Sequence, residues 1–359
     1  MLHLELEKIH EYTQPVSKAG SLMAMDSFYK ARQVLSEDSY ENVAVSISGG
    51  RDSDIMLDLI TKILKDNSEV RYIWFDTGLE YQATKRHLDD LERKYGITIE
   101  RLKAQKPIPL SCKEYGIPFL SKMVSENIER LQKYGFQWED EDYETLAARY
   151  PKIAKSSISW WCNLRDTGEF GYSMFNIDYN TSLKDFLIAN PPTFNVSKKC
   201  CNYAKKNVSH KFIKDNNIDL MIMGIRKAEG GVRSMKYKTC WDNPDDGCHF
   251  YRPLFWYTTE DEKIYDETFG VTHSDCYEVW GFTRTGCVGC PFNRNVAEEL
   301  EIVREREPQM YKACQHVFGQ SYAYTAKYRR YQQAAKEGKL LNIGGKKHCL
   351  DDLLETEDD

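Results

Sequence analysis

Residues 43–60 read VAVSISGGRDSDIMLDLI, and this stretch decides the fold that the rest of the chain is expected to adopt. Residues 43–47 are apolar and mostly β-branched, which predicts a buried strand. Residues 54–60 have the spacing of an amphipathic helix. Between them, Gly49 and Gly50 let the backbone approach a ligand without a Cβ in the way. The helix start presents free N–H groups and a positive dipole end, so the turn is expected to bind a phosphate or another anion.

The turn belongs to neither of two common phosphate-binding motifs, because it lacks a Gly-Lys-Ser/Thr ending and the G-x-G-x-x-G spacing. It resembles the pyrophosphate loop (PP-loop), S-G-G-x-D-S, of adenine-nucleotide α-hydrolases. That family includes sulfonucleotide reductases, tRNA thiolation enzymes and DNA phosphorothioation sulfurtransferases. The alternative is an ordinary Gly-Gly turn. The resemblance implies nucleotide contacts from Ser48, Gly49, Gly50, Arg51, Asp52 and Ser53. Asp52 would repel a phosphate unless it caps the helix or holds a cation.

Strand-like and helix-like segments alternate after the turn, which favours a parallel α/β sheet. Strands are predicted at 43–48, 71–75 and 97–102, with helices at 53–65 and 82–95. Ligands bind beyond the carboxyl ends of such strands. The second strand ends at a polar segment that is expected to face the nucleotide or its Mg²⁺, and its candidate residues are Asp76, Thr77, Gly78 and Glu80. The expected fold is an adenine nucleotide α-hydrolase-like twisted parallel sheet flanked by helices, with a helical insertion and C-terminal helices.

The pattern predicts five regions along the chain. They are N-terminal helices at 1–37, the first half of the α/β core at 38–103, a helical insertion at 104–199, the second half of the core with cluster ligands at 200–295, and C-terminal helices with an acidic tail at 296–359. The second N-terminal helix is expected to start near Asp26. The core resumes with a helix at 203–215, a strand at 219–223 and a helix at 259–268.

Bulk properties limit the class of protein. The apolar fraction of 41% is enough for a packed core, and no apolar run reaches the length of a transmembrane helix. The first residues lack the basic-then-apolar pattern of a signal peptide, so a cytoplasmic location without membrane association is expected. The formal net charge of −6 excludes a global basic field for nucleic acid, although a local basic groove stays open.

The chain has 11 cysteines, and two pairs stand apart from the others: Cys200-Cys201 and Cys287-Val288-Gly289-Cys290. Disulfides are unexpected in the cytosol, so clustered cysteines there indicate metal or redox chemistry. Four thiolates suit zinc or an iron–sulfur cluster equally well on count alone. Adjacent cysteines supply two ligands only at a bend or a helix start. The remaining cysteines are expected to be small core residues.

The two pairs are similar to the cluster pattern of assimilatory adenylylsulfate reductases, in which a Cys-Cys pair is followed at a distance by Cys-x-x-Cys. The loop from Arg284 to Phe292, RTGCVGCPF, looks like the loop of that family. The resemblance implies a 4Fe–4S cluster held by Cys200, Cys201, Cys287 and Cys290, with zinc or reduced structural thiols as alternatives.

Two further segments resemble the same family. Residues 224–233 are similar to its glycine–arginine segment, which implies a nucleotide contact from Gly224 and anion clamps from Arg226 and Arg233. The alternative is a pair of surface arginines. Residues 251–256 look like the Arg-Pro-Leu turn that precedes an aspartate-bearing helix, here containing Asp261. The implied catalytic residues are Asp52, Arg226 and Arg233.

One departure from the sequence pattern of sulfonucleotide reductases bears on which reaction is expected. Sulfonucleotide reductases carry a nucleophilic cysteine in a C-terminal Glu-Cys-Gly-(Ile/Leu)-His segment, whereas this chain has Lys-Lys-His348-Cys349-Leu. The first hypothesis is an ATP pyrophosphatase or sulfurtransferase that binds ATP or a related adenine nucleotide with Mg²⁺. It would activate a substrate for sulfur transfer and release pyrophosphate. The second is a reductase of adenylylsulfate-type nucleotides that uses Cys349. The third is a non-catalytic regulator in a defence complex.

The expected partners follow from the same resemblance. They are an adenine nucleotide, a nucleic-acid substrate, a cysteine desulfurase or thioredoxin-like donor, and a second copy of the chain in a homodimer.

Overall fold

The computed structural model describes residues 2–5, 8–37, 40–230, 237–243 and 247–349. The chain divides into two compact units, each built from two separate segments. Unit 1 comprises residues 1–107 and 203–288, and unit 2 comprises residues 108–202 and 289–359. Each unit has a hydrophobic core of its own.

Unit 1 contains a six-stranded sheet in the order β3-β2-β1-β4-β6-β5. Five strands run parallel, and the short edge strand β5 is antiparallel to β6. The strands are β1 Val43–Ile47, β2 Arg71–Asp76, β3 Ile99–Lys103, β4 Leu220–Met223, β5 Trp241–Asp242 and β6 His249–Tyr251. The predicted parallel sheet flanked by helices is therefore confirmed. Because β1 lies between β2 and β4, the direction of winding reverses at β1, and this is where α/β sheets place ligands.

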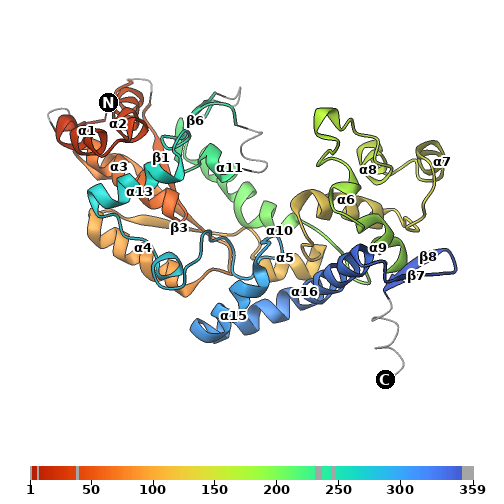
Figure 1. Ribbon diagram of the computed structural model, residues 1–359. Helices are drawn as coiled ribbons and strands as arrows, with labels where there is room; N and C mark the ends of the chain where they lie inside the picture. Colours follow the sequence, from red (N-terminus) through yellow and green to blue (C-terminus); the bar gives the residue numbers. More distant parts are fainter. Residues whose placement is uncertain (1, 6–7, 38–39, 231–236, 244–246, 350–359) are drawn as a thin grey trace. The chain divides into compact units, whose positions relative to one another are not determined.

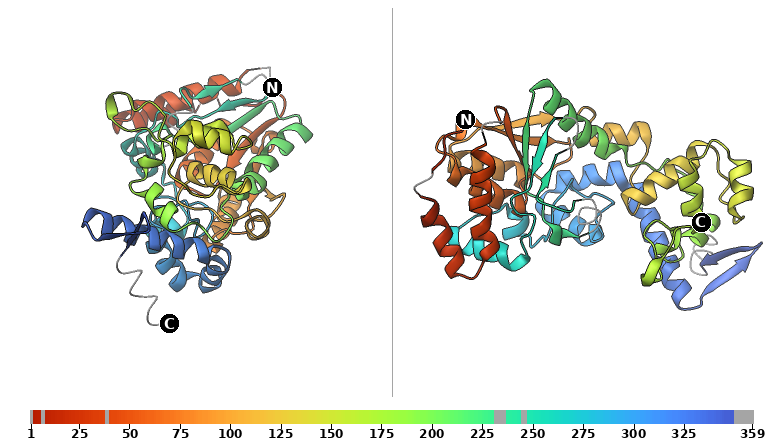
Figure 2. Two further views of the ribbon diagram at one scale, coloured as in Figure 1. Left: turned by 90° about the vertical axis from the view of Figure 1, so that its right-hand side faces the viewer. Right: turned by 90° about the horizontal axis from the view of Figure 1, so that it is seen from above.

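Helices cover both faces of this sheet (Figures 1 and 2). Val43, Val45 and Ile47 of β1 point into the main core, which also contains side chains of the N-terminal helices and of the helices after β1 and β2. Ala44 points to the other face, where a second cluster includes Phe212. This alternation explains why the apolar run at 43–47 is buried on both faces. The helices of unit 1 are α1 Ile9–Lys18, α2 Leu22–Leu35, α3 Arg51–Ile63, α4 Gln82–Tyr95, α11 Asn207–Asp215, α13 Thr259–Phe269 and α14 Asp275–Glu278.

Unit 2 is helical, and its aromatic side chains form one core. Trp160 and Trp161 are fully buried in it, so they pack and offer no surface for stacking bases. Tyr328 and Tyr331 of the long helix α16 are buried against Phe186. The main helices are α5 Ile108–Tyr115, α6 Lys122–Lys133, α7 Tyr143–Arg149, α8 Lys155–Trp161, α9 Leu183–Ala189, α10 Lys199–Cys201, α15 Val296–Arg306 and α16 Pro308–Lys336. The hairpin of β7 Leu340–Ile343 and β8 Lys346–Cys349 follows α16.

The structure corrects three local predictions. Helix α2 begins at Leu22 rather than near Asp26, because the Ser21 hydroxyl caps it by accepting from the Ala24 N–H at 3.0 Å. The helix expected at 203–215 opens with a π-helical turn, Asn202–Lys206, before α11. The β7–β8 hairpin was not predicted, although its turn contains Gly344 and Gly345, both with positive φ.

Candidate functional site

The glycine turn after β1 has the geometry of an anion-binding loop. Gly49 has φ +68°, and a Cβ there would lie 2.7 Å from Thr84 Cγ2, so only glycine fits without a shift. Gly50 is the residue before α3, and no side chain caps this helix. The Ser48 N–H donates to Ser53 Oγ at 2.9 Å, which closes the turn over the helix start. The open, uncapped end of α3 fits a phosphate group.

Asp52 does not cap the helix but pairs with the predicted anion clamp. Its Oδ1 lies 3.1 Å from Arg226 Nε, and Arg226 Nη2 lies 2.8 Å from Glu262 Oε2. The Arg226 side chain is almost buried, yet its Nη1 has no hydrogen-bond partner among the described residues. A buried guanidinium donor without a partner is costly, and an incoming anionic oxygen would satisfy it.

The carboxyl of Glu262 is the second acidic group at this arginine. Burial and the neighbouring Asp52 carboxylate raise the pKa of Glu262 to about 9, although Arg226 opposes the shift. The raised pKa favours the protonated form of the buried Glu262 carboxyl.

Gly224 brings the end of β4 against the loop. A Cβ at Gly224 would lie 2.7 Å from the Asp52 carbonyl oxygen and 3.0 Å from Ser53 Cα, so the close approach requires glycine. On another side of the loop, Tyr277 Oη lies 3.0 Å from the Cβ position of Gly50 and 2.8 Å from Thr285 Oγ1. The loop is thus bordered by the backbone at Gly224 and by the hydroxyl groups of Tyr277 and Thr285, which belong to one distant segment.

A buried hydrogen-bonded network of two aspartates and two histidines lies behind the loop. Asp54 Oδ2 lies 3.0 Å from His87 Nε2 and 2.9 Å from His273 Nδ1, and His273 Nε2 lies 3.0 Å from Asp266 Oδ2. Burial lowers the pKa of His273, but its hydrogen bonds to Asp266 and Asp54 outweigh burial and raise this pKa to about 9. Arg51 Nη1 lies 3.7 Å from Asp266 Oδ2, so this network extends to a residue of the loop itself.

The polar end of β2 forms a second, smaller group. The Gly78 N–H donates to Asp76 Oδ1 at 3.0 Å, and the buried Thr77 hydroxyl donates to Glu80 Oε1 at 2.5 Å. Burial raises the pKa of Glu80, while Lys205 and Thr77 act against the shift. The structure therefore assembles Asp76, Thr77, Gly78 and Glu80 at the strand end that neighbours β1, as predicted for a parallel sheet.

Three of the four predicted cluster ligands belong to unit 2. The Cys200-Cys201 pair lies in the short helix α10, directly before the π-helical turn, so it occupies the helix start that two adjacent ligands require. Hydrogen bonding to the Cys112 thiol raises the pKa of Cys200, and a charge on Cys290 acts in the same direction. Cys287 is the penultimate residue of the second segment of unit 1.

A single metal ion and an iron–sulfur cluster require different spacings of the four sulfur atoms. Within the described ranges, no group of three or more His, Cys, Asp or Glu side chains is arranged to hold a metal ion. A single zinc ion needs all its sulfurs about 2.3 Å from one point. A 4Fe–4S cluster binds each thiolate through a different iron, so its four sulfurs lie farther apart. The described positions of Cys200, Cys201 and Cys290 therefore do not by themselves distinguish a cluster from a single ion.

Three further residues were singled out in the sequence, namely Arg233, Cys349 and Asp261. Arg233 lies outside the described residues. Cys349, the alternative nucleophile, is 2% exposed in β8 and packs in the core of unit 2. Asp261 caps α13 through the Thr258 N–H at 2.8 Å and accepts from Ser21 Oγ at 2.6 Å, so it has a structural role. Sequence reasoning missed Glu262, its neighbour, which faces Arg226.

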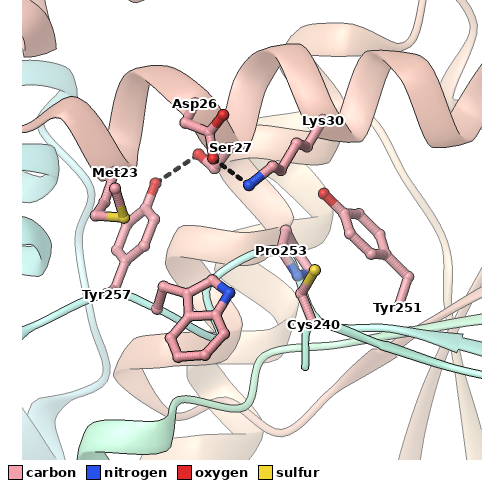
Figure 3. Close-up of a pocket in the computed structure, with 9 residues that line it drawn as sticks. Met23, Asp26, Ser27, Lys30, Cys240, Tyr251, Pro253 and Tyr257 are labelled. Carbon is pink, nitrogen blue, oxygen red and sulfur yellow. Dashed lines mark hydrogen bonds and ion pairs between the residues drawn. The ribbon is translucent and has the colours of Figure 1, made fainter. Parts of the chain in front are cut away.

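A small pocket lies between α2 and the segment 240–257 (Figure 3). Ser27 Oγ and Tyr257 Oη are 2.7 Å apart on one side of it, and Lys30 pairs with Asp26 at 2.5 Å. Burial raises the pKa of Tyr251, whose hydroxyl also lines the pocket. None of the predicted nucleotide or cluster ligands lines this pocket.

The part of the chain that the structure describes contains no helix whose length and apolar character would let it cross a membrane.

Comparison with known proteins matches residues 42–148 to the phosphoadenosine phosphosulfate reductase domain. An uncharacterized protein of Methanocaldococcus jannaschii is 45% identical over 101 residues, which cover 24% of this chain. The chain spans only 20% of the length of that relative.

Two solved structures share a low overall similarity with this chain. A phosphoadenylyl-sulfate reductase from Candida auris, solved as a phosphate complex, has a TM-score of 0.39 and 14% identity, covering 80% of this chain and 97% of its own. The U34-tRNA thiolase NcsA from Methanococcus maripaludis, solved with its [4Fe-4S] cluster, has a TM-score of 0.35 and 12% identity. It covers 84% of this chain and 79% of its own.

Proposed function

We propose that unit 1 binds ATP or a related adenine nucleotide and activates a substrate for sulfur transfer, releasing pyrophosphate, because it contains most of the residues, 42–148, that match the phosphoadenosine phosphosulfate reductase domain. One observation carries this proposal. Arg226 is held at the start of α3 by Asp52 and Glu262, while its buried Nη1 keeps a free donor beside the uncapped glycine turn. A phosphate chain would supply the missing acceptor and use the N–H groups of the turn.

The proposed reaction has two steps. A substrate oxygen attacks the α-phosphorus of ATP, the bond from that phosphorus to the bridging oxygen breaks, and pyrophosphate leaves with the bonding electrons. A sulfur nucleophile then attacks the activated substrate atom, and the adenylated oxygen departs with AMP. In the first step negative charge grows on the leaving phosphates, where Arg226 and the start of α3 would stabilise it. Asp52 would position Arg226 rather than touch the nucleotide.

Residues at the loop do not fit a protein-held Mg²⁺ in the arrangement described. Asp52 is engaged by Arg226, and Asp76 accepts from the Gly78 N–H. Mg²⁺ is often bound mainly by substrate phosphates and water, with one or two protein carboxylates. We therefore assign it no step, and it would arrive with the nucleotide.

A 4Fe–4S cluster would be held by the thiolates of the predicted ligands Cys200, Cys201, Cys287 and Cys290. When bound, such a cluster can carry a sulfur atom or serve as a structural clamp. The protein's own contribution is to bury Cys200 and to fix the adjacent pair in the first turn of a helix. The expected donor of sulfur is a cysteine desulfurase or thioredoxin-like protein, and the expected acceptor is a nucleic acid.

The burial of Cys349 disfavours the reductase alternative. A nucleophilic cysteine must reach the sulfur of its substrate, and buried structural cysteines are inert. Cys349 pairs with Leu340 in the β7–β8 ladder and is 2% exposed. A sulfur-transfer enzyme needs no nucleophile at this position.

The test combines nucleotide binding with pyrophosphate release. Arg226→Met is expected to weaken ATP binding about ten- to a hundredfold, because a hydrogen bond to a charged group contributes about 1.5–3 kcal/mol. Arg226→Lys should recover part of the loss. The matched control is Arg304→Met, which removes an exposed arginine on α15. Pyrophosphate release from ATP is measured with bulk tRNA or DNA as the acceptor.

Two results would contradict the proposal. Equal ATP affinity in Arg226→Met and the wild type would remove Arg226 from the site. Tight ATP binding without pyrophosphate release, with any acceptor and donor supplied, would instead support the regulator hypothesis.

A further inference from the structure

Helix α16 and the residues that follow it are basic in an otherwise acidic chain. The 29 residues of α16 include no Asp or Glu, although 29% of the residues in the chain are charged. Between positions 308 and 349, Glu337 is the only acidic residue and eight residues are basic, so this segment has a formal charge of +7 in a chain of net charge −6. The basic residues are Lys312, Lys327, Arg329, Arg330, Lys336, Lys339, Lys346 and Lys347.

One face of α16 packs in the core of unit 2, and the other is exposed. In its C-terminal half the aromatic side chains of Tyr328 and Tyr331 are buried. The exposed positions of this half recur every three or four residues, and they are Ala326, Arg329, Arg330, Gln333 and Lys336. A helix face that only needs to be soluble usually mixes charges of both signs. This face presents positive charge alone.

A third arginine lies against this face. The Arg329 guanidinium donates to the Arg294 carbonyl at 2.8 Å, and Arg294 is itself exposed in the turn before α15. Within the described ranges, Arg294, Arg329 and Lys336 form no ion pair. By contrast, several basic side chains of the helical insertion pair with carboxylates, namely Arg130, Arg149, Lys184, Lys198 and Lys199.

The β7–β8 hairpin follows α16 and packs against it (Figure 1). The Tyr331 hydroxyl donates to the Lys347 carbonyl at 3.1 Å, which fixes the hairpin to the C-terminal half of the helix. Lys347 pairs with Asp185 at 2.9 Å. Lys346 is exposed and forms no ion pair in the part of the chain that the structure describes, and it lies opposite the exposed Ile343 in the ladder.

We propose that Arg294, Arg329, Arg330, Lys336 and Lys346 form a basic surface of unit 2 that binds the phosphate backbone of a nucleic acid. This inference rests on the proposed function, because it assigns a binding surface to the expected acceptor. The net charge of the whole chain cannot attract a polyanion, so the attraction has to come from a local surface of this kind.

The chemistry of the basic surface matches a row of phosphates. Guanidinium groups bind phosphate oxygens in a bidentate manner. Arg329 and Lys336 are seven residues apart, which is about 10 Å along a helix axis and equals the rise of about three nucleotides in one strand of B-form DNA. The acidic tail at 351–359 also has a matching charge, with six acidic residues and no basic one. The experiment therefore includes the tail as a competing occupant.

The assay is fluorescence anisotropy of labelled bulk tRNA, and of a labelled DNA duplex, titrated with the full-length protein from about 50 to 200 mM salt. Four phosphate contacts predict a slope of log affinity against log salt of about −3 to −4. Replacing Arg329, Lys336 and Lys346 together by Gln should make the slope less steep by about 2–3 and weaken binding at least tenfold. An equal effect on both probes would indicate backbone recognition, and an effect on tRNA alone would identify RNA as the ligand.

The matched control replaces Lys122, Lys152 and Lys155 by Gln, which removes the same charge from exposed positions elsewhere in unit 2. It should keep the wild-type slope and affinity. Both triple variants should keep the melting temperature of the wild type, because the substituted side chains are exposed. The wild-type slope and affinity in the Arg329, Lys336 and Lys346 variant would overturn the basic surface.

Two further measurements complete the test. Nucleic-acid binding that appears only after the acidic residues of the tail are changed to Asn and Gln would also overturn the proposal, because the basic surface would then hold the tail. ATP binding separates the basic surface from the proposed function. The Arg329, Lys336 and Lys346 variant should bind ATP like the wild type, and Arg226→Met should bind tRNA like the wild type. Nucleic-acid binding without ATP binding in the wild type would contradict the proposed function and support the basic surface.

Discussion

The buried histidine behind the glycine turn makes the stability of unit 1 depend on pH. The pKa of His273 rises from its ordinary value of 6.5 to about 9 in the folded protein, because Asp54 and Asp266 hydrogen-bond both of its ring nitrogens. Each pKa unit corresponds to about 1.36 kcal/mol. The shift therefore contributes about 3 kcal/mol to the free energy of unfolding.

The sign of the effect follows from the direction of the shift. A raised histidine pKa favours the folded state while the unfolded histidine is already protonated, so the full contribution is present below pH 6.5. The contribution falls as the pH rises from 6.5 through 9, because the folded protein then also loses this proton. His273→Gln removes the titrating group but keeps a polar side chain of similar reach.

The assay is urea unfolding of the wild type and His273→Gln between pH 6 and 10. The difference in unfolding free energy should be largest at pH 6 and should shrink by about 3 kcal/mol by pH 10. Glu262 acts in the same direction, since its pKa is also raised, so the comparison is repeated in a Glu262→Gln background. His210→Gln, at an exposed position of α11, is the control. A difference that stays constant with pH would refute the charged bridge between Asp54 and Asp266.

Two further predictions concern packing. Gly224→Ala should lower the free energy of unfolding by about 1–3 kcal/mol and weaken ATP binding at least tenfold, because the new methyl group would lie 2.7 Å from the Asp52 carbonyl oxygen. The control is Gly319→Ala in α16, where the nearest neighbouring atom is 3.9 Å from the Cβ position. This control should change neither quantity in the same titration and melting assays. Trp161→Ala should destabilise unit 2 by about 3–5 kcal/mol, since Trp161 is fully buried and donates to the Glu139 carbonyl at 2.9 Å. It should leave the affinity for ATP, measured by calorimetry, unchanged, and a loss of binding would show that the two units are coupled.

The sheet and the loop could be predicted because their signals are local. An apolar run, two glycines and a helical period follow one another within residues 43–60, and each fixes the backbone over a few positions. Alternation of such segments then placed the ends of β1 and β2 at one edge of the sheet, as the structure confirms. The predicted start of α2 near Asp26 is wrong because the Ser21 cap lets the helix begin at Leu22.

The charged groups behind the loop could not be predicted in the same way. Asp54, His87 and Asp266 come from three helices and His273 from the loop between α13 and α14, and no fixed spacing in the sequence relates them. Only tertiary packing brings them together. Glu262 could not be singled out even though its helix was predicted correctly. The resemblance pointed to the neighbouring Asp261, but Asp261 accepts a hydrogen bond from Thr258, and it is Glu262 that pairs with Arg226.

The distance along the chain between β3 and β4 has a consequence for synthesis on the ribosome. β1 pairs with both β2 and β4, but β3 ends at Lys103 and β4 begins only at Leu220. At about 5–20 residues per second, the ribosome needs roughly 6–25 s to synthesise the residues between β3 and β4. Until β4 has been made, one side of β1 cannot pair with its native partner strand. During that interval a nascent chain presents an apolar edge that other strands can capture. Cells making this protein should therefore depend on co-translational chaperones more than its size alone would suggest.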